Sequence, residues 1–337
     1  MAVTSRVLIT QPIPEPGPGL LRNFGADVEV SPHDRPLTNV ELRDAVRGRD
    51  AVLCLLTDRI DAKVLDAAQG CRLFANLAVG FNNIDLAEAS RRGILVTNTP
   101  GILTEATADL TWALILGIAR RVVEGDAEMR NGRYTGWGPS YMLGGDVTGA
   151  TLGLIGPGRI AVAVARRAVG FRMRLIYHGR RPSPELDALG ATLQTLDEVL
   201  RESDFVSVHV PLSAETTHLI DEQALARMKP TAYLINTSRG PVVDESALVD
   251  ALRSGRIAGA GLDVYENEPR MAEGLANCAN TLLLPHLGSA TIATRAAMSR
   301  MAAENVIAFL QGQRPPNLVN AEVWNSAGND APDTGAD

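Results

Sequence analysis

The feature that most constrains the fold of this chain is a repeated alternation of short apolar runs with helical patterns. Short apolar runs in the first hundred residues cover 6–10, 27–30, 51–56, 73–77 and 94–98. Helical patterns lie between them at 39–46, 61–68 and 84–92. Neighbouring parallel strands need a crossover between them, and a helix usually supplies it. The alternation therefore predicts an α/β domain with a parallel sheet.

A second alternating series begins after residue 150. It follows a helical pattern over about 103–121 and a stretch rich in glycine and aromatic residues, 130–149, that has no clean period. Six expected strands lie at about 151–156, 173–178, 205–210, 232–237, 258–264 and 281–285, with helices at about 159–169, 195–202, 221–227 and 246–253. Thr195 and Glu198 have the spacing of a capping box. The pattern predicts a second doubly wound domain.

The end of the chain contains one more long element. An alanine-rich helical pattern runs from Ser289 to about Leu310, and residues 326–337 are small and polar. A segment of that composition cannot bury enough apolar surface to fold, so we expect a disordered tail at 326–337.

Length and charge limit the classes of function. The chain has 337 residues, enough for about two domains, and its formal net charge is -7. An acidic chain without a basic cluster is a poor partner for nucleic acid or an anionic membrane. The longest apolar stretch, 110–119, is about half a membrane span. Three scattered cysteines do not describe a disulfide framework, and we expect a cytoplasmic protein.

A glycine-rich turn opens the second series. Gly156, Pro157 and Gly158 follow an apolar run, and Arg159 and Ile160 begin a helical pattern. Glycines in this context allow a tight turn and a close approach of the backbone to a pyrophosphate, which the helix N-terminus attracts. The motif predicts dinucleotide binding. An ordinary strand-to-helix turn is the alternative, and Pro157 lacks one N–H that could bind phosphate.

The next strand end bears on which dinucleotide is bound. An NAD site usually places Asp or Glu about 20 residues beyond the glycines, but this chain has Gly179, Arg180 and Arg181 there. Guanidinium groups pair with phosphate oxygens, so we expect NADPH and NADP+ to be preferred, with NADH also accepted. The alternative is that both arginines belong to a solvated turn.

Three residues past later strand ends suggest reduction of a 2-keto acid. Arg239 could bind the carboxylate and carbonyl, His286 could donate the proton, and Glu268 could favour the imidazolium. Ligands of open α/β sheets bind at the carboxyl ends of the strands, where these residues are expected. Each has a plainer interpretation: Arg239 as a solvated charge, Glu268 as a helix or turn cap, and His286 as a structural histidine.

The chain closely resembles the D-isomer-specific 2-hydroxyacid dehydrogenases, and among them the glyoxylate and hydroxypyruvate reductases, from about Val7 to Asn320. The motifs that carry the resemblance are 77–85 (LAVGFNNID), 96–109 (VTNTPGILTEATAD), 153–160 (GLIGPGRI), 209–212 (HVPL), 235–240 (INTSRG), 258–264 (AGAGLDV) and 285–291 (PHLGSAT).

The resemblance implies the same catalytic residues, Arg239, Glu268 and His286. It implies that Val79 and Gly80 bind the substrate carboxylate through backbone N–H groups, with Leu55 nearby, and that Asp263 holds the nicotinamide carboxamide. The remaining residues expected around the cofactor are Thr107, Gly156, Pro157, Gly158, Arg159, Ile160, Gly179, Arg180, Arg181, His209, Val210, Pro211, Thr216, Thr237, Ser238 and Gly288. No metal is expected.

The resemblance also implies the domain order. Residues 1–98 with 289–325 would form a substrate-binding domain, 99–288 a cofactor domain, and the active site would lie in the cleft between them. Such proteins form homodimers through the cofactor domain, with the segment 124–148 around the neighbour and Trp137 reaching toward the partner's active site.

Two alternatives to a glyoxylate and hydroxypyruvate reductase remain open. One is a related dehydrogenase for D-3-phosphoglycerate, D-lactate or a phenylpyruvate-type acid, although no extra cation for a substrate phosphate is apparent near Leu55, Val79, Phe81 and Trp137. The other is a cofactor-sensing, non-catalytic protein like the corepressors built on this fold.

Overall fold

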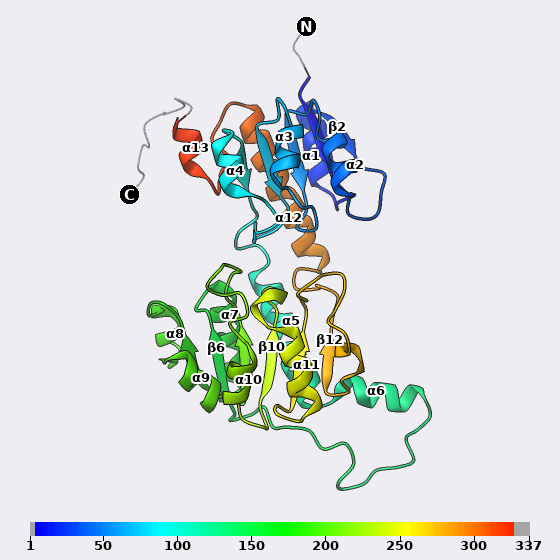
Figure 1. Ribbon diagram of the computed structural model, residues 1–337, viewed down its shortest axis with the longest axis vertical. Coiled ribbons are helices and arrows are strands. Elements are labelled where there is room, and N and C mark those ends of the chain that lie inside the picture. Colours follow the sequence, from blue (N-terminus) through cyan, green and yellow to red (C-terminus); the bar gives the residue numbers. More distant parts are fainter. Residues whose placement is uncertain (1–3, 327–337) are drawn as a thin grey trace. The chain divides into compact units, whose positions relative to one another are not determined.

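A computed structural model describes residues 4–326 of the chain, and these residues form two compact units (Figure 1). The first, here called the N-terminal unit, combines the segment that ends at Leu103 with the segment that starts at Thr291. The second, here called the central unit, is Thr104–Ala290. These boundaries lie a few residues beyond the expected ones at 98 and 288. Of the expected tail 326–337, Ser326 ends a helix, and the rest lies outside the described residues.

The N-terminal unit is built on a five-stranded parallel sheet in the order β2-β1-β3-β4-β5. Its strands are β1 (Arg6–Ile9), β2 (Asp27–Val30), β3 (Ala51–Cys54), β4 (Leu73–Asn76) and β5 (Leu95–Thr97). The helices between them are α1 (Gly17–Phe24), α2 (Asn39–Ala45), α3 (Ala62–Ala67) and α4 (Leu86–Arg91). This is the flavodoxin-like strand order expected of a doubly wound domain.

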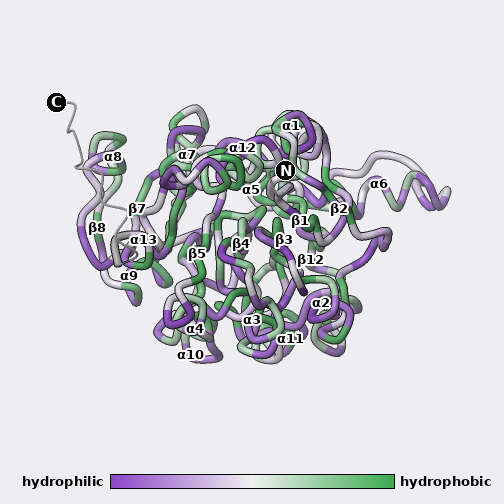
Figure 2. The backbone as a smooth tube through the Cα atoms, turned by 90° about the horizontal axis from the view of Figure 1, so that it is seen from above, coloured by the Kyte–Doolittle hydropathy of each residue, from purple (hydrophilic) through white to green (hydrophobic). Residues whose placement is uncertain are grey.

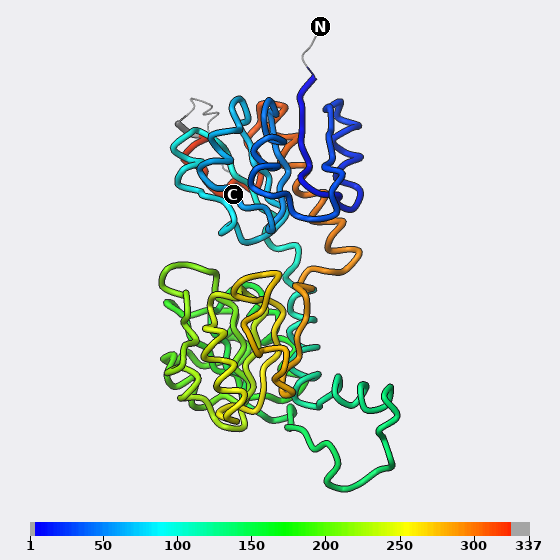
Figure 3. The backbone as a smooth tube through the Cα atoms, turned by 45° about the vertical axis from the view of Figure 1, so that its right-hand side comes forward, coloured from blue at the N-terminus to red at the C-terminus, as the bar shows by residue number. Residues whose placement is uncertain are grey.

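Both ends of the chain contribute to this unit. The helices α12 (Ile292–Leu310) and α13 (Ala321–Ser326) lie beside the N-terminal strands, so the orange and red segments accompany the blue ones in Figure 3. Met298, Ala302 and Val306 of α12 share one core with Val7 and Leu53. A second core, on the other face of the sheet, joins α2, α3 and α4.

The central unit contains a seven-stranded parallel sheet in the order β12-β11-β10-β9-β6-β7-β8. The strands are β6 (Thr151–Ile155), β7 (Arg174–His178), β8 (Thr192–Leu193), β9 (Phe205–Val208), β10 (Tyr233–Asn236), β11 (Gly259–Leu262) and β12 (Thr281–Leu283). Six of them match the expected runs. The edge strand β8 was missed because it has two exposed residues and no apolar run.

The strand order places a ligand crevice at the centre of this sheet. From β6 the chain builds outward to β7 and β8 and then crosses back to β9 and onward to β12. The carboxyl ends of β6 and β9 therefore flank a topological switch point, where doubly wound sheets bind their ligands.

Helices cover both faces of this sheet. They are α5 (Thr104–Ala119), α7 (Arg159–Ala168), α8 (Pro184–Asp187), α9 (Leu196–Glu202), α10 (Glu222–Arg227) and α11 (Glu245–Arg253). The capping box at Thr195 and Glu198 is confirmed, because the Thr195 hydroxyl accepts the Glu198 N–H and the Glu198 carboxylate accepts the Thr195 N–H.

An arm extends from the central unit. The helix α6 (Val122–Arg130) buries none of its residues, and with the segment that follows it projects away from the sheet of this unit (Figures 1 and 3). Hydrophobic and hydrophilic residues alternate along α6 (Figure 2), and Val123, Met129 and Trp137 expose large apolar side chains. No helix within residues 4–326 is long and apolar enough to cross a membrane.

Candidate active site

Three predicted catalytic residues follow adjacent strands of the central unit. Arg239 comes just after β10, Glu268 follows β11, and His286 follows β12. His286 Nδ1 lies 2.9 Å from Glu268 Oε2, within hydrogen-bond distance. The side chains of His286 and Glu268 are 25% and 31% exposed, so a ligand can still reach them.

The charges around Glu268 keep it ionised. Burial alone would raise its pKa, but the hydrogen bond and positive charge of His286, the backbone N–H of Tyr265 and the charge of Arg239 lower the pKa of Glu268 below its ordinary value. A carboxylate that accepts Nδ1–H leaves Nε2 as the free end of the ring. His286 is therefore held in the orientation that a proton donor at Nε2 requires.

The backbone around Arg239 is fixed by an asparagine at the end of β10. Asn236 Nδ2 donates to the carbonyl of Arg239 at 3.0 Å, and Asn236 Oδ1 accepts both the backbone N–H and the hydroxyl of Ser238. Burial lowers the pKa of Arg239, and the attraction of Glu268 opposes that shift. An arginine stays charged in proteins, so this half-buried guanidinium is a fixed cation for an anionic substrate.

Gly240 brings the loops of Arg239 and Glu268 together. A Cβ built on Gly240 would lie 1.9 Å from the carbonyl carbon of Tyr265, so no other residue fits there without displacing the backbone. Tyr265 donates its hydroxyl to the carbonyl of Leu284 at 2.9 Å, which ties the Glu268 loop to the His286 loop. The three loops are thus joined by one close backbone approach and one side-chain hydrogen bond.

Asp263 and Thr107 fix the backbone beyond His286. The carboxylate of Asp263 accepts the N–H of Leu287 at 2.7 Å and that of Gly288 at 2.8 Å, and Thr107 Oγ1 donates to the carbonyl of Gly288. His286 itself has φ 57°, a left-handed conformation that a non-glycine residue adopts at a cost. The three hydrogen bonds to Leu287 and Gly288 hold the loop in which His286 takes this left-handed conformation.

The glycine-rich turn has the geometry that a dinucleotide needs. Gly156 has φ 97°, and a Cβ there would lie 2.7 Å from the side chain of Val210. Gly158 precedes α7 without a side-chain cap, and no atom lies within 4 Å of a Cβ built on it. The first N–H groups of α7, from Arg159 and Ile160, have no partner within the helix, as the N–H donors of a pyrophosphate site require.

The loop after β7 carries two exposed cations and no carboxylate. Arg180 and Arg181 are both exposed, and neither forms a hydrogen bond or an ion pair with the described residues. The chemistry of these donors fits a phosphate on the adenosine ribose better than a free 2′-hydroxyl. The structure thus keeps both predicted guanidinium groups available beside Gly179.

The remaining predicted cofactor residues lie along the carboxyl ends of β9 and β10. Burial lowers the pKa of His209 to about 3, so its imidazole is neutral and bonds to Ser207. Thr216 Oγ1 donates to the carbonyl of Pro211 and shapes that turn. Thr237 Oγ1 lies 3.0 Å from Thr111 Oγ1, which anchors it to α5.

The predicted substrate-binding residues of the N-terminal unit follow β3 and β4. Asn98 Nδ2 donates to the carbonyl of Val79 at 2.8 Å, and Asn76 Nδ2 donates to the carbonyl of Gly80 at 2.9 Å. The N–H groups of Val79 and Gly80 form no hydrogen bond within residues 4–326. The carbonyl groups of Val79 and Gly80 are thus fixed by asparagine side chains, and their N–H groups remain available to bind an anion.

Asp58 and Asn83 support Leu55 in the same unit. Asp58 accepts the Leu55 N–H at 2.8 Å, and Asn83 Nδ2 donates to the Leu55 carbonyl at 3.1 Å. Sequence reasoning missed these supporting residues, as it missed Asn76, Asn98 and Asn236. Asn76 and Asn236 did leave a signal, because each is a buried amide that ends an apolar strand.

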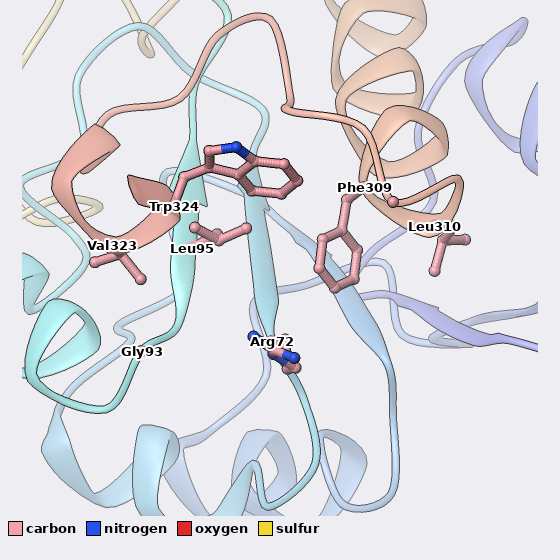
Figure 4. A pocket seen from close by; sticks show the side chains of 8 residues that line it. Arg72, Gly93, Leu95, Phe309, Leu310, Val323 and Trp324 are labelled. Carbon is pink, nitrogen blue, oxygen red and sulfur yellow. The ribbon is translucent and has the colours of Figure 1, made fainter. Parts of the chain in front are cut away.

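A cavity lies apart from these residues in the N-terminal unit. Arg72, Leu95, Phe309 and Trp324 help to line this space of about 290 Å³ (Figure 4). Arg72 and Leu95 stand at the amino ends of β4 and β5, whereas Val79 and Gly80 follow the carboxyl end of β4. Within residues 4–326 no cluster of three or more His, Cys, Asp or Glu could hold a metal ion.

Comparison with known proteins identifies the family. Residues 112–288 match the NAD binding domain of the D-isomer specific 2-hydroxyacid dehydrogenases. A glyoxylate reductase from Thermococcus onnurineus is 50% identical over 325 residues, which cover 95% of this chain and 97% of that protein. The chain belongs to the D-isomer specific 2-hydroxyacid dehydrogenase family.

Solved structures of similar proteins agree with this D-2-hydroxyacid dehydrogenase assignment. A protein from Thermus thermophilus has a TM-score of 0.88 and 47% identity, with 93% of this chain and 99% of that chain covered. An NADPH-dependent glyoxylate/hydroxypyruvate reductase from Sinorhizobium meliloti, in complex with NADP and malonate, has a TM-score of 0.82 and 34% identity, with 94% and 97% covered. The predicted family and two-sheet α/β fold are thereby confirmed.

Proposed function

We propose that this dehydrogenase is an NADPH-preferring reductase of small 2-keto acids that converts glyoxylate to glycolate and hydroxypyruvate to D-glycerate. The observation that carries the proposal is the hydrogen-bonded pair of His286 and Glu268, with the charge of Arg239 nearby, in a chain half identical to glyoxylate reductases. Together these groups provide a proton donor, its charged partner and an anchor for a carboxylate.

In the proposed mechanism, Arg239 pairs with the carboxylate and carbonyl oxygen of the keto acid. The N–H groups of Val79 and Gly80 bind the carboxylate as well. When bound, NADPH supplies the hydride that reaches the carbonyl carbon. The Nε2–H of protonated His286 donates its proton to the carbonyl oxygen, and Glu268 stabilises the imidazolium before transfer. One keto acid, one hydride and one proton give one hydroxy acid.

A substrate panel tests the proposed reaction. The purified protein should oxidise NADPH with glyoxylate and hydroxypyruvate at a higher kcat/KM than with pyruvate or phenylpyruvate, as followed by nicotinamide absorbance. A higher kcat/KM with pyruvate or phenylpyruvate would assign the protein to another dehydrogenase. Tight cofactor binding without turnover of any keto acid would indicate a cofactor sensor.

The preference for NADPH is supported by the exposed side chains of Arg180 and Arg181, which form no hydrogen bond or close ion pair within residues 4–326. Arg180→Ser combined with Arg181→Ser should lower kcat/KM for NADPH about 10- to 100-fold and leave that for NADH nearly unchanged, because charge-assisted bonds to phosphate are lost. Arg166→Ser, which removes an exposed arginine from α7, is the matched control. Equal losses with both cofactors would contradict the preference.

We also propose that the protein works as a homodimer in a reducing cytoplasm. The exposed apolar side chains of the arm, among them Val123, Met129 and Trp137, which is 82% exposed, support a second copy as the partner. Cys54, Cys71 and Cys278 are buried free thiols, in keeping with a reducing compartment.

A further inference from the structure

The proline in the glycine-rich turn contacts the glycine of the loop that carries the two arginines. A Cβ built on Gly179 would lie 2.6 Å from both Cδ and Cγ of Pro157. The pyrrolidine ring therefore occupies the place that a side chain at 179 would take. Because the ring locks φ, it is a rigid surface against the loop.

A hydrogen bond and a second anchor hold the same loop. The N–H of Gly156 donates to the carbonyl of His178 at 2.9 Å, which joins the glycine-rich turn to the end of β7. At the other end of the loop, the hydroxyl of Tyr177 accepts the N–H of Ser183 at 3.0 Å and donates to Asp187 at 2.7 Å.

Between these two anchors the loop exposes its cations. Within residues 4–326 the side chains of Arg180 and Arg181 form no hydrogen bond or close ion pair, and Arg180 has only a longer-range attraction to Glu215, so their position depends mainly on the contacts at the two ends of the loop. Two of those contacts involve the turn that would bind the pyrophosphate: the Gly156–His178 hydrogen bond and the contact of Pro157 with Gly179. The hydrogen bond ends at His178, whereas the Pro157 contact reaches Gly179, the residue next to Arg180, and so bears most directly on the spacing between the pyrophosphate donors and the guanidinium groups.

We propose that Pro157 is a specificity-determining positioning residue, whose ring against Gly179 holds Arg180 and Arg181 where they can bind a 2′-phosphate. This inference rests on the proposed NADPH preference. Proline removes one N–H from the turn, a loss that both NAD+ and NADP+ would share, whereas the placement of the arginines favours NADP+ alone. The selectivity for NADP+ over NAD+ thus depends on the contact between Pro157 and Gly179, although neither residue would bind the 2′-phosphate itself.

The test is a double-mutant cycle on binding in the absence of substrate. Titration calorimetry gives the Kd of NAD+ and of NADP+ for wild type, Gly179→Ala, Pro157→Ala and the double variant. Gly170→Ala is the matched control, because a Cβ there meets no atom within 4 Å. Thermal unfolding of each variant shows whether the fold is kept.

We expect Gly179→Ala to lower the ratio of Kd for NAD+ to Kd for NADP+ about tenfold, which is the worth of one weakened charge-assisted bond. Pro157→Ala should also lower the ratio through a larger Kd for NADP+, with the Kd for NAD+ equal or smaller because an N–H is regained. In the double variant the new methyl group enters the space left by the ring, so the ratio should recover at least half of the loss, on a logarithmic scale.

Three results would overturn the inference. The first is an unchanged ratio in both folded single variants, and the second is a double variant no more selective than Gly179→Ala. If wild type binds NADP+ more tightly than NAD+, either of these two results refutes the role of Pro157 and leaves the proposed NADPH preference intact. The third, a wild-type ratio near one, would refute the NADPH preference together with the inference. If Gly179→Ala does not fold, Pro157→Ala, which only removes atoms, gives the decisive ratio.

Discussion

The carboxylate of Glu245 accepts the backbone N–H of Glu266, and this bond fixes the start of the loop that carries Glu268. The other oxygen of Glu245 accepts the N–H of Ala272 at 2.7 Å. Glu245 is 2% exposed, and burial raises its pKa. One buried side chain thus holds the loop on both sides of the residue that orients His286.

Removing one acceptor from this arrangement should loosen the loop. Glu245→Gln turns an NH₂ group toward one of the two backbone N–H groups, and an unsatisfied buried donor costs about 1–3 kcal/mol. We expect faster hydrogen exchange at residues 265–272 and a lower kcat, with an unchanged Kd for NADP+. Glu273→Gln, at an exposed position in the same loop, is the control. Unchanged exchange at 265–272 would mean that Glu245 does not hold the loop.

His286→Gln should remove the proton donor and keep the fold. General acid catalysis contributes about 10²- to 10⁴-fold, and kcat for glyoxylate should fall by that amount. The Kd for NADP+ should stay the same, because no proposed cofactor contact is lost. His33→Gln changes an exposed histidine of the N-terminal unit and should leave kcat unchanged. Retention of most of kcat by His286→Gln would remove His286 from the mechanism.

The lowered pKa of Glu268 predicts a pH-dependent contribution to stability. The folded-state pKa lies below the unfolded value of 4.5, so the ionised carboxylate stabilises the fold above pH 4.5, and this contribution is lost as pH falls through the folded pKa. Glu268→Gln should therefore lower Tm at pH 7, and the difference from wild type should shrink in strong acid. Glu304→Gln, on the exposed side of α12, is the control. A Tm difference that grows toward low pH would contradict this sign.

Asn98 should matter for substrate binding through the carbonyl of Val79. Asn98→Ala removes the hydrogen bond to that carbonyl. Loss of one hydrogen bond costs about 0.5–1.5 kcal/mol, which corresponds to a KM for glyoxylate about 2- to 10-fold higher. The KM for NADPH should not change. Asn39→Ala removes an amide that bonds to Asp61 elsewhere in this unit and serves as the control. Equal changes in the two KM values would point to a general loss of structure.

The arm should hold two copies together. Wild type should sediment at twice the mass of the chain, and Trp137→Asp combined with Met129→Asp should shift the protein toward the monomer, because charge is placed on apolar side chains that a second copy would bury. Val40→Asp, which alters an exposed apolar residue outside the arm, is the control. A monomeric wild type would refute the proposed dimer.

Much of the fold could be predicted from the order of residues. Buried parallel strands appear as short apolar runs, and this periodicity identified every strand except β8, whose two exposed residues carry no hydrophobic signal. The glycine-rich turn and the pair Arg180 and Arg181 were visible because turn geometry and charge are local properties. The family motifs supplied the roles expected of Arg239, Glu268 and His286.

Tertiary structure decided what surrounds those residues. Nothing in the sequence links Glu245 to the N–H groups of Glu266 and Ala272, or Pro157 to Gly179, because these partners are brought together by strand order and loop packing. The sequence by itself determined all strands within residues 4–326 except β8, and it determined the chemical groups, because hydrophobic periodicity and side-chain chemistry are local properties of the residues. Only the tertiary structure decided which backbone N–H and C=O groups are hydrogen-bonded and which remain available, because hydrogen bonds between distant segments depend on how those segments pack together.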